Sequence, residues 1–147
     1  MTRSEYVKLL EEISEAIVKD KSGTFEKIPV YYDMVELTPH SLPPTCIAFD
    51  GKPFGWDKSN CLLERQLNIV ILHSTRNKRQ ITERLSAYAE QLLLILREVD
   101  LPSGSELTVL QGSEIGYLEN AKKDSESYKS TKTLLTSFIV VSCLVRY

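Results

Sequence analysis

The chain ends on an apolar segment, Lys132–Tyr147, that predicts one long β-strand. It is rich in β-branched and aromatic residues and contains no Gly or Pro, a composition typical of strands. Apolar residues fall on both faces of this strand, so we expect it to lie centrally in a sheet. A chain terminus usually frays unless a sheet or a docked helix holds it. Here the end of the chain therefore belongs to the core, and the rest of the fold must be arranged around it.

Two further segments predict amphipathic helices. Residues 4–20 and a stretch of about twenty residues up to Val99 carry apolar side chains at steps of three and four, which places them on one face of a helix. Thr2 and Glu5 have the spacing of a capping box at the start of the first helix. Asn77 and Gln80 are candidate caps for the second, whose apolar stripe widens in its second half. We therefore expect that half to be the more buried.

The remaining ordered segments predict strands. They are Val30–Leu37, Thr45–Phe49, Leu62–His73 and Glu106–Ile115, with a Gly-, Pro- and aromatic-containing loop predicted at Gly51–Asn60. A pair of helices covering one sheet is the economical packing for this order of elements. The sequence thus predicts a single α+β domain spanning residues 1–147. It is a two-layer sandwich, a mostly antiparallel sheet of about five strands packed by two amphipathic helices.

Composition excludes several classes of function. The formal net charge is -2, whereas domains that grip nucleic acid are usually strongly basic. No apolar run approaches the roughly 20 residues that span a bilayer, and the start lacks the apolar core of a signal peptide. We therefore expect synthesis in the cytoplasm, no membrane and no sequence-specific nucleic acid. Cys46, Cys61 and Cys143 are an odd number without close spacing, which predicts buried free thiols.

Catalytic and cofactor motifs are absent from the sequence. His40 and His73 are the only histidines, far apart and without a second ligand nearby, so we expect them to be polar surface residues. There is no Gly-x-Ser-x-Gly elbow and no phosphate-binding or dinucleotide-binding fingerprint. The sequence therefore predicts no enzyme activity, no cofactor and no metal site, although active sites assemble in space rather than in sequence.

Two short segments are candidates for contact with a partner. Phe54 and Trp56 place large aromatics in the predicted loop, where they either fold back onto the core or anchor a partner, since Trp is enriched at interface hot spots. Arg76, Lys78 and Arg79, with Arg84, form a basic cluster at the start of the second helix. This cluster is either a solvated helix start or a contact for phosphate or an acidic surface.

An extended polar loop is predicted at about residues 116–131, just before the terminal strand. Loops longer than about 12 residues are uncommon in compact domains and are then often functional or disordered. The loop mixes charges and carries two aromatic residues, and its candidate interface residues are Tyr117, Lys122, Lys123, Tyr128 and Lys129. Two interpretations remain: a segment that becomes ordered against a neighbouring subunit, or an inert hairpin tip.

Taken together, this layout resembles the tail-terminator (tail-completion) proteins of long-tailed bacteriophages. The resemblance lies in the first amphipathic helix, the strand at Glu64–Ile71, the long helix at Gln80–Val99 and the closing run Phe138–Tyr147 after an extended loop. It covers nearly the whole chain in order and texture, without an invariant motif. The segment from Cys46 to Asn60 is not matched to that family.

The resemblance implies a structural virion protein at the junction of tail and neck. Such a protein forms a ring, expected to be a homohexamer, that caps the tail tube, ends its polymerisation and joins the tail to the head. Its partners would be further copies of itself, the tail-tube protein and a neck or head-completion protein, with DNA passing through the ring. The alternatives are another head-tail joining or minor tail protein, or a small α+β enzyme with an unrecognised active site.

Overall fold

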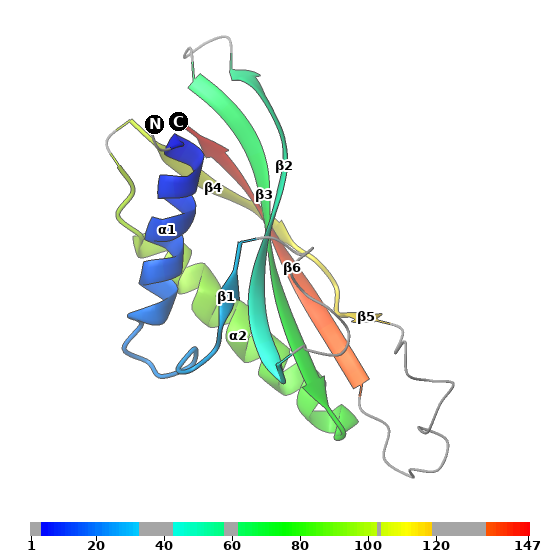
Figure 1. Cartoon of the computed structure of the whole chain (residues 1–147). Helices are drawn as coiled ribbons and strands as arrows, with labels where there is room; N and C mark the ends of the chain where they lie inside the picture. Colours follow the sequence, from blue (N-terminus) through cyan, green and yellow to red (C-terminus); the bar gives the residue numbers. More distant parts are fainter. Residues whose placement is uncertain (1–3, 33–42, 58–61, 103, 119–134) are drawn as a thin grey trace.

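Two helices pack on a six-stranded open sheet that is mixed but mostly antiparallel (Figure 1). The computed structural model describes residues 4–32, 43–57, 62–102, 104–118 and 135–147. The elements are α1 (Glu5–Val18), β1 (Val30–Tyr31), β2 (Thr45–Asp57), β3 (Leu62–Thr75), α2 (Lys78–Glu98), β4 (Glu106–Gly112), β5 (Gly116–Leu118) and β6 (Leu135–Arg146). The predicted α+β class is confirmed.

The terminal strand β6 is central, as predicted. The strand order is β1-β2-β3-β6-β4, and the short β5 pairs with the first part of β6. On one side β6 pairs along its whole length with β3, and on the other side it pairs with β5 and then with β4. Among the described strands, only the contact of β1 with β2 is parallel. The end of the chain is thus held by hydrogen bonds on both sides, which explains why it does not fray.

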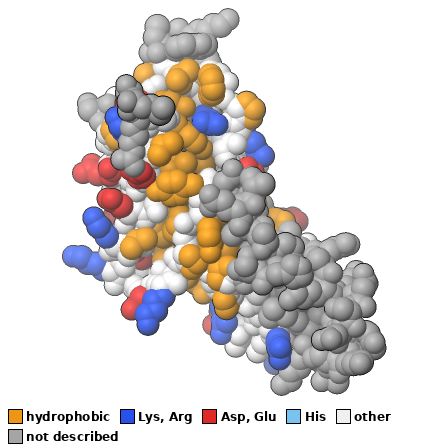
Figure 2. All heavy atoms as spheres, viewed as in Figure 1, with side chains coloured by type: hydrophobic (Ala, Val, Ile, Leu, Met, Phe, Trp, Pro, Cys, Tyr) orange, Lys and Arg blue, Asp and Glu red, His pale blue; other side chains and the backbone are white. Residues whose placement is uncertain are grey.

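The two faces of the sheet bury different apolar sets. Alternate residues of a strand point to opposite faces, so Ile69 and Ile71 of β3 join the core beneath the helices while Val70 and Leu72 belong to a second cluster. The helix-side core contains residues of α1, α2 and every long strand; its largest fully buried side chain is Phe49. The second cluster is smaller and consists of Cys46, Ala48, Val70 and Leu72, with Tyr31, Phe138 and Val140 packed against it. In the view of Figure 2, hydrophobic side chains form a band along the molecule.

Both helices begin and end close to where the sequence predicts. The N-cap of α1 is Ser4, whose side chain makes no capping hydrogen bond, and Thr2 of the predicted capping box lies outside the described residues. Asn77 caps α2 as predicted, because its side chain accepts a hydrogen bond from the Arg79 backbone N–H at 3.1 Å. The segment just after α1 is tied to α2 by a hydrogen bond that Gln91 donates to the carboxylate of Asp20 at 3.1 Å.

The prediction of a loop at Gly51–Asn60 is wrong for residues 51–57. These residues continue β2, which pairs with β3 as far as Asp57 opposite Leu62. The register shifts between Gly51 and Phe54, so Pro53 sits in a bulge, where a residue without an N–H is tolerated. Tertiary pairing with β3 thus overrides the local turn signals.

Other boundaries differ from the predictions in smaller ways. The strand predicted at Val30–Leu37 is described only as Val30–Tyr31, and residues 33–37 lie outside the described ranges. The strand predicted at Glu106–Ile115 ends at Gly112. Residues 116–118, placed in the predicted extended loop, form β5 instead because they pair with β6. The rest of that loop, and residues 132–134 of the predicted terminal strand, fall outside the described ranges.

Candidate interaction surface

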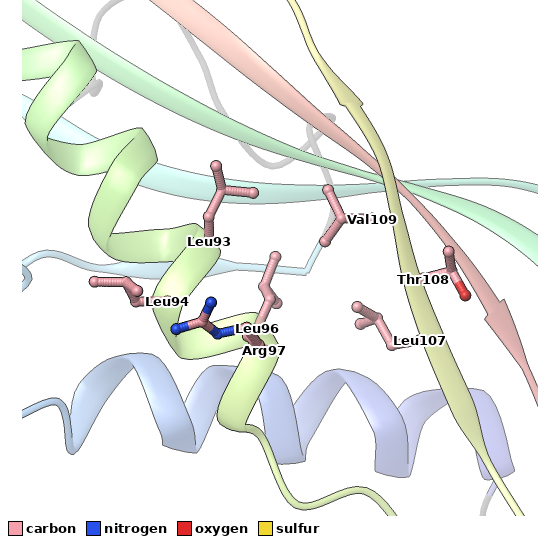
Figure 3. Close-up of a pocket in the computed structure, with 7 residues that line it drawn as sticks. All are labelled: Leu93, Leu94, Leu96, Arg97, Leu107, Thr108 and Val109. Atoms are coloured by element: carbon pink, nitrogen blue, oxygen red, sulfur yellow. The ribbon is translucent and has the colours of Figure 1, made fainter.

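An apolar groove of about 510 Å³ lies between the second half of α2 and the edge strand β4 (Figure 3). Leu107 and Val109 point from β4 toward the helix, while Thr108 between them points away, as strand alternation requires. The lining residues are Leu93, Leu94, Leu96, Arg97, Leu107, Thr108 and Val109. Leu93 is 40% exposed and Val109 37%. The groove therefore presents accessible apolar surface with a single charged group, the Arg97 guanidinium.

Two edges of the sheet lack a strand partner among the residues that the structure describes. Strand β4 pairs with β6 on one side only. On the opposite edge, β1 pairs only with Ile47 and Ala48 of β2, so residues 49–57 pair with β3 alone. Unpaired strand edges present backbone donors and acceptors that another chain can use.

Phe54 lies on the β2 edge and is 63% exposed. Opposite it on β3, the Arg65 guanidinium carbon lies 3.9 Å from the centre of the Tyr6 ring of α1 and 6.0 Å from that of Phe54. The Arg65 Nε also donates to the Lys52 carbonyl at 2.6 Å. Burial raises the pKa of the Tyr6 phenol, and the Arg65 charge opposes that rise. Arg65 thus fixes the bulged part of β2 and leaves the Phe54 ring presented to solvent.

The basic cluster at the start of α2 is split by the structure. Arg76, Lys78 and Arg79 line a shallow pocket of about 390 Å³ together with the capping residue Asn77. Arg84 lies apart from this pocket, because one of its guanidinium nitrogens is 3.4 Å from Nε2 of His73. The pocket at the helix N-terminus is therefore lined by three of the four cations.

His73 is buried, only 3% exposed, which corrects the prediction that it is a surface residue. Its Nδ1 lies 2.8 Å from the Thr45 hydroxyl, and its ring packs edge-on against Tyr88. Arg84 has donors only, so Nε2 accepts from it, and the neutral ring carries its proton on Nδ1. Burial first, and the Arg84 charge second, lower the pKa of His73. The histidine is therefore held neutral as part of the packing between β2, β3 and α2.

This arrangement predicts a loss of stability in mild acid. Because the pKa of His73 is lower in the folded state, the unfolded chain takes up the proton first, and the free energy of unfolding falls as pH drops below about 6.5. We expect the wild type to lose more stability between about pH 7 and pH 5 than His73→Gln, measured by urea denaturation. Equal pH dependence in the two proteins would contradict this assignment, since all other titrating groups are common to both.

The remaining predicted interface residues divide into described and undescribed ones. Tyr117 on β5 is 60% exposed. The backbone of Trp56 pairs with Leu63 in the sheet. Lys122, Lys123, Tyr128 and Lys129 lie outside the described residues, as do His40 and Cys61. The groove was not predicted from the sequence. The unbroken apolar run Leu92–Leu96 could have indicated it, because five consecutive apolar residues cannot all lie on one buried face of a helix.

Cys46 and Cys143 are buried free thiols, as predicted. Burial raises the pKa of the Cys46 thiol to about 11 and that of Cys143 to about 12. Thiolates are the reactive form, so neither group is a nucleophile at neutral pH. Within the ranges covered by the structure, no three His, Cys, Asp or Glu side chains gather as metal ligands. The helices α1 and α2 are also not long and apolar enough to cross a membrane.

No protein-family model matches the chain, and no curated protein is significantly similar to it.

Proposed function

We propose that this protein is a structural component of a bacteriophage tail. It forms a ring of identical subunits that caps the tail tube, ends tube polymerisation and provides the joint to the neck of the head. The functional class in this proposal comes from the resemblance of the sequence to tail-terminator proteins. Catalysis plays no part in this role, since interfaces and ring geometry carry it.

One observation supports self-assembly most directly: exposed apolar side chains are present at two different edges of the sheet. Phe54 is on the β2 edge, whereas Leu93 and Val109 border the groove on the β4 edge. The two surfaces differ in shape, one a projecting ring and the other a hollow. Different complementary surfaces on one subunit favour head-to-tail contacts, which close into rings when the rotation per subunit allows it.

The alternative of a small enzyme receives less support from the geometry. An enzyme site needs polar groups converging on a pocket. The groove carries Arg97 as its one charged residue and is otherwise apolar except for Thr108, and the pocket at the start of α2 contains cations and an amide only. His73 lines neither of them. The geometry of these two pockets therefore supports assembly better than catalysis.

The proposed function is tested with the purified protein and a tail-tube protein from the same genome. We expect size-exclusion chromatography with light scattering to show one discrete oligomer, and electron microscopy to show rings, free or at tube ends. Tubes polymerised in the presence of the protein should be shorter than tubes polymerised alone. A protein that stays monomeric and leaves tube length unchanged would refute the proposal. Rings that bind a neck protein but do not stop the tube would indicate a head-tail joining role instead.

A further inference from the structure

We infer that copies of this chain associate through an intermolecular strand pair, in which Phe54 enters the α2–β4 groove of the next subunit. In this pair, residues 49–57 of β2, which have no second strand partner among the described residues, lie beside β4 of that subunit. The inference rests on the proposed ring and specifies the contact that builds it. It assigns the occupant of the groove as a second copy of the same chain.

Strand direction is the first argument. The contacts β2–β3, β3–β6 and β6–β4 are all antiparallel, so β2 and β4 run in opposite directions at the two edges. Subunits related by a rotation axis along the strands keep their strand directions. The β2 edge of one copy therefore meets the β4 edge of the next in the antiparallel sense. The sheet continues across the boundary with the same alternation that it has inside the subunit.

The face of the sheet is the second argument. Phe54 pairs with Arg65, Arg65 pairs with Val145, and Val145 pairs with Leu107. These four residues form one row across the sheet, from the exposed Phe54 at one edge to the groove at the other. Directly paired residues share a face, and this row lies on the helix side, where Arg65 covers Tyr6 of α1 and Val145 is in the core. Phe54 of a neighbouring copy, placed opposite Leu107 or Val109, therefore arrives on the side where the groove opens.

The chemistry of the groove suits an aromatic ring. Leu93, Leu107 and Val109 offer apolar contacts, and Arg97 lines the same hollow. A guanidinium can stack on an aromatic face, as Arg65 does on Tyr6 within the subunit. Burying most of the exposed part of Phe54 removes roughly 100 Å² of apolar surface from water.

The size of this contact has a consequence for assembly. A strand pair and one aromatic ring bury less than the ~800 Å² per partner typical of stable complexes. A single contact is therefore weak, and closure of the ring or binding to the tube adds the further contacts that hold it. We expect self-association of the free protein to depend steeply on its concentration.

Two variants test the contact, each altering one of the two edges. Phe54→Ser removes the projecting ring. Leu93→Glu puts a charge in the groove while leaving a favourable spacing of four residues to Arg97 on the helix. We expect each variant alone to associate at least about tenfold more weakly than the wild type, measured by sedimentation velocity over a concentration series. Val18→Ser, which changes an equally exposed apolar residue on α1, should associate like the wild type.

Mixing the two variants gives the sharpest readout. In an equimolar mixture the intact groove of Phe54→Ser meets the intact Phe54 of Leu93→Glu. The mixture should form heterodimers with wild-type-like affinity but no rings, because the other edge of each subunit is blocked. A contact between two like edges would give no such rescue. Circular dichroism of each variant verifies that it is folded.

The outcomes separate the contact from the proposed function. Failure of the mixture to rescue association, or wild-type association of both folded variants, overturns the inferred contact and leaves the ring proposal standing if rings still form. Rescue by mixing, together with unchanged tube length, keeps the contact and refutes the role at the tail. A wild type that remains monomeric at every concentration, alone and with tubes, overturns both.

Discussion

Replacing Phe49 by alanine is expected to lower the free energy of unfolding by about 3–5 kcal/mol. Phe49 on β2 is completely buried and is the largest fully buried side chain of the described core. Its ring lies 5.8 Å from that of Tyr32 between centroids. The substitution removes the transfer free energy of the ring and leaves a cavity beneath the helices. Urea denaturation at a low protein concentration, where the protein is monomeric, measures the loss.

Phe54→Ala is the matched control, since it removes the same ring from the same strand. Phe54 is largely exposed, so we expect a change in unfolding free energy within about 0.5 kcal/mol. A large loss for both variants would contradict the assignment of the two rings to core and surface. The pair also separates stability from assembly, because only Phe54 belongs to the proposed contact.

Gly116→Ala is expected to destabilise the fold by about 1–3 kcal/mol. A methyl group at this position of β5 would meet three atoms of the Phe138 ring on the paired strand β6. The ring packs against the cluster on the outer face of the sheet, so moving it away disturbs a second set of contacts. Thermal or urea denaturation of the variant measures the effect.

Gly112→Ala is the control for this effect. A methyl group at Gly112, the last residue of β4, would meet nothing within 4 Å, and its backbone does not have a positive φ. We expect it to change stability by less than about 0.5 kcal/mol. Equal destabilisation by the two substitutions would mean that the loss of glycine itself, rather than the Phe138 contact, is responsible.

Much of the fold follows from the periodicity of the sequence. The three- and four-residue spacing located α1 and α2, and the apolar terminal segment correctly predicted that β6 is central. The long pairing of β2 with β3 was missed because Gly51, Pro53 and Gly55 are local turn signals, whereas residues 54–57 are held in the sheet by their pairing with residues 62–65 of β3. Local signals do not contain that information.

The candidate site was predicted only in part. The sequence made Phe54 a candidate for contact with a partner but placed it in a loop, whereas it lies on a sheet edge. The groove needs α2 and β4 together, and periodicity does not state which helix face lies beside which strand. In Leu92–Leu96, three residues are buried and Leu93 and Leu94 are exposed. A run of five apolar residues covers more than one helix face, so it signals either a deeply buried helix or an exposed surface.

The two described cysteines can serve as probes of local opening on the two faces of the sheet. Cys143 belongs to the core beneath the helices, and Cys46 belongs to the cluster on the other face. A thiol reagent reaches each one only when its own layer opens. The two labelling rates therefore measure how often the packing on each face of the sheet opens locally. Comparing the rates in the free and the assembled protein shows whether a neighbouring subunit suppresses opening on one face more than on the other.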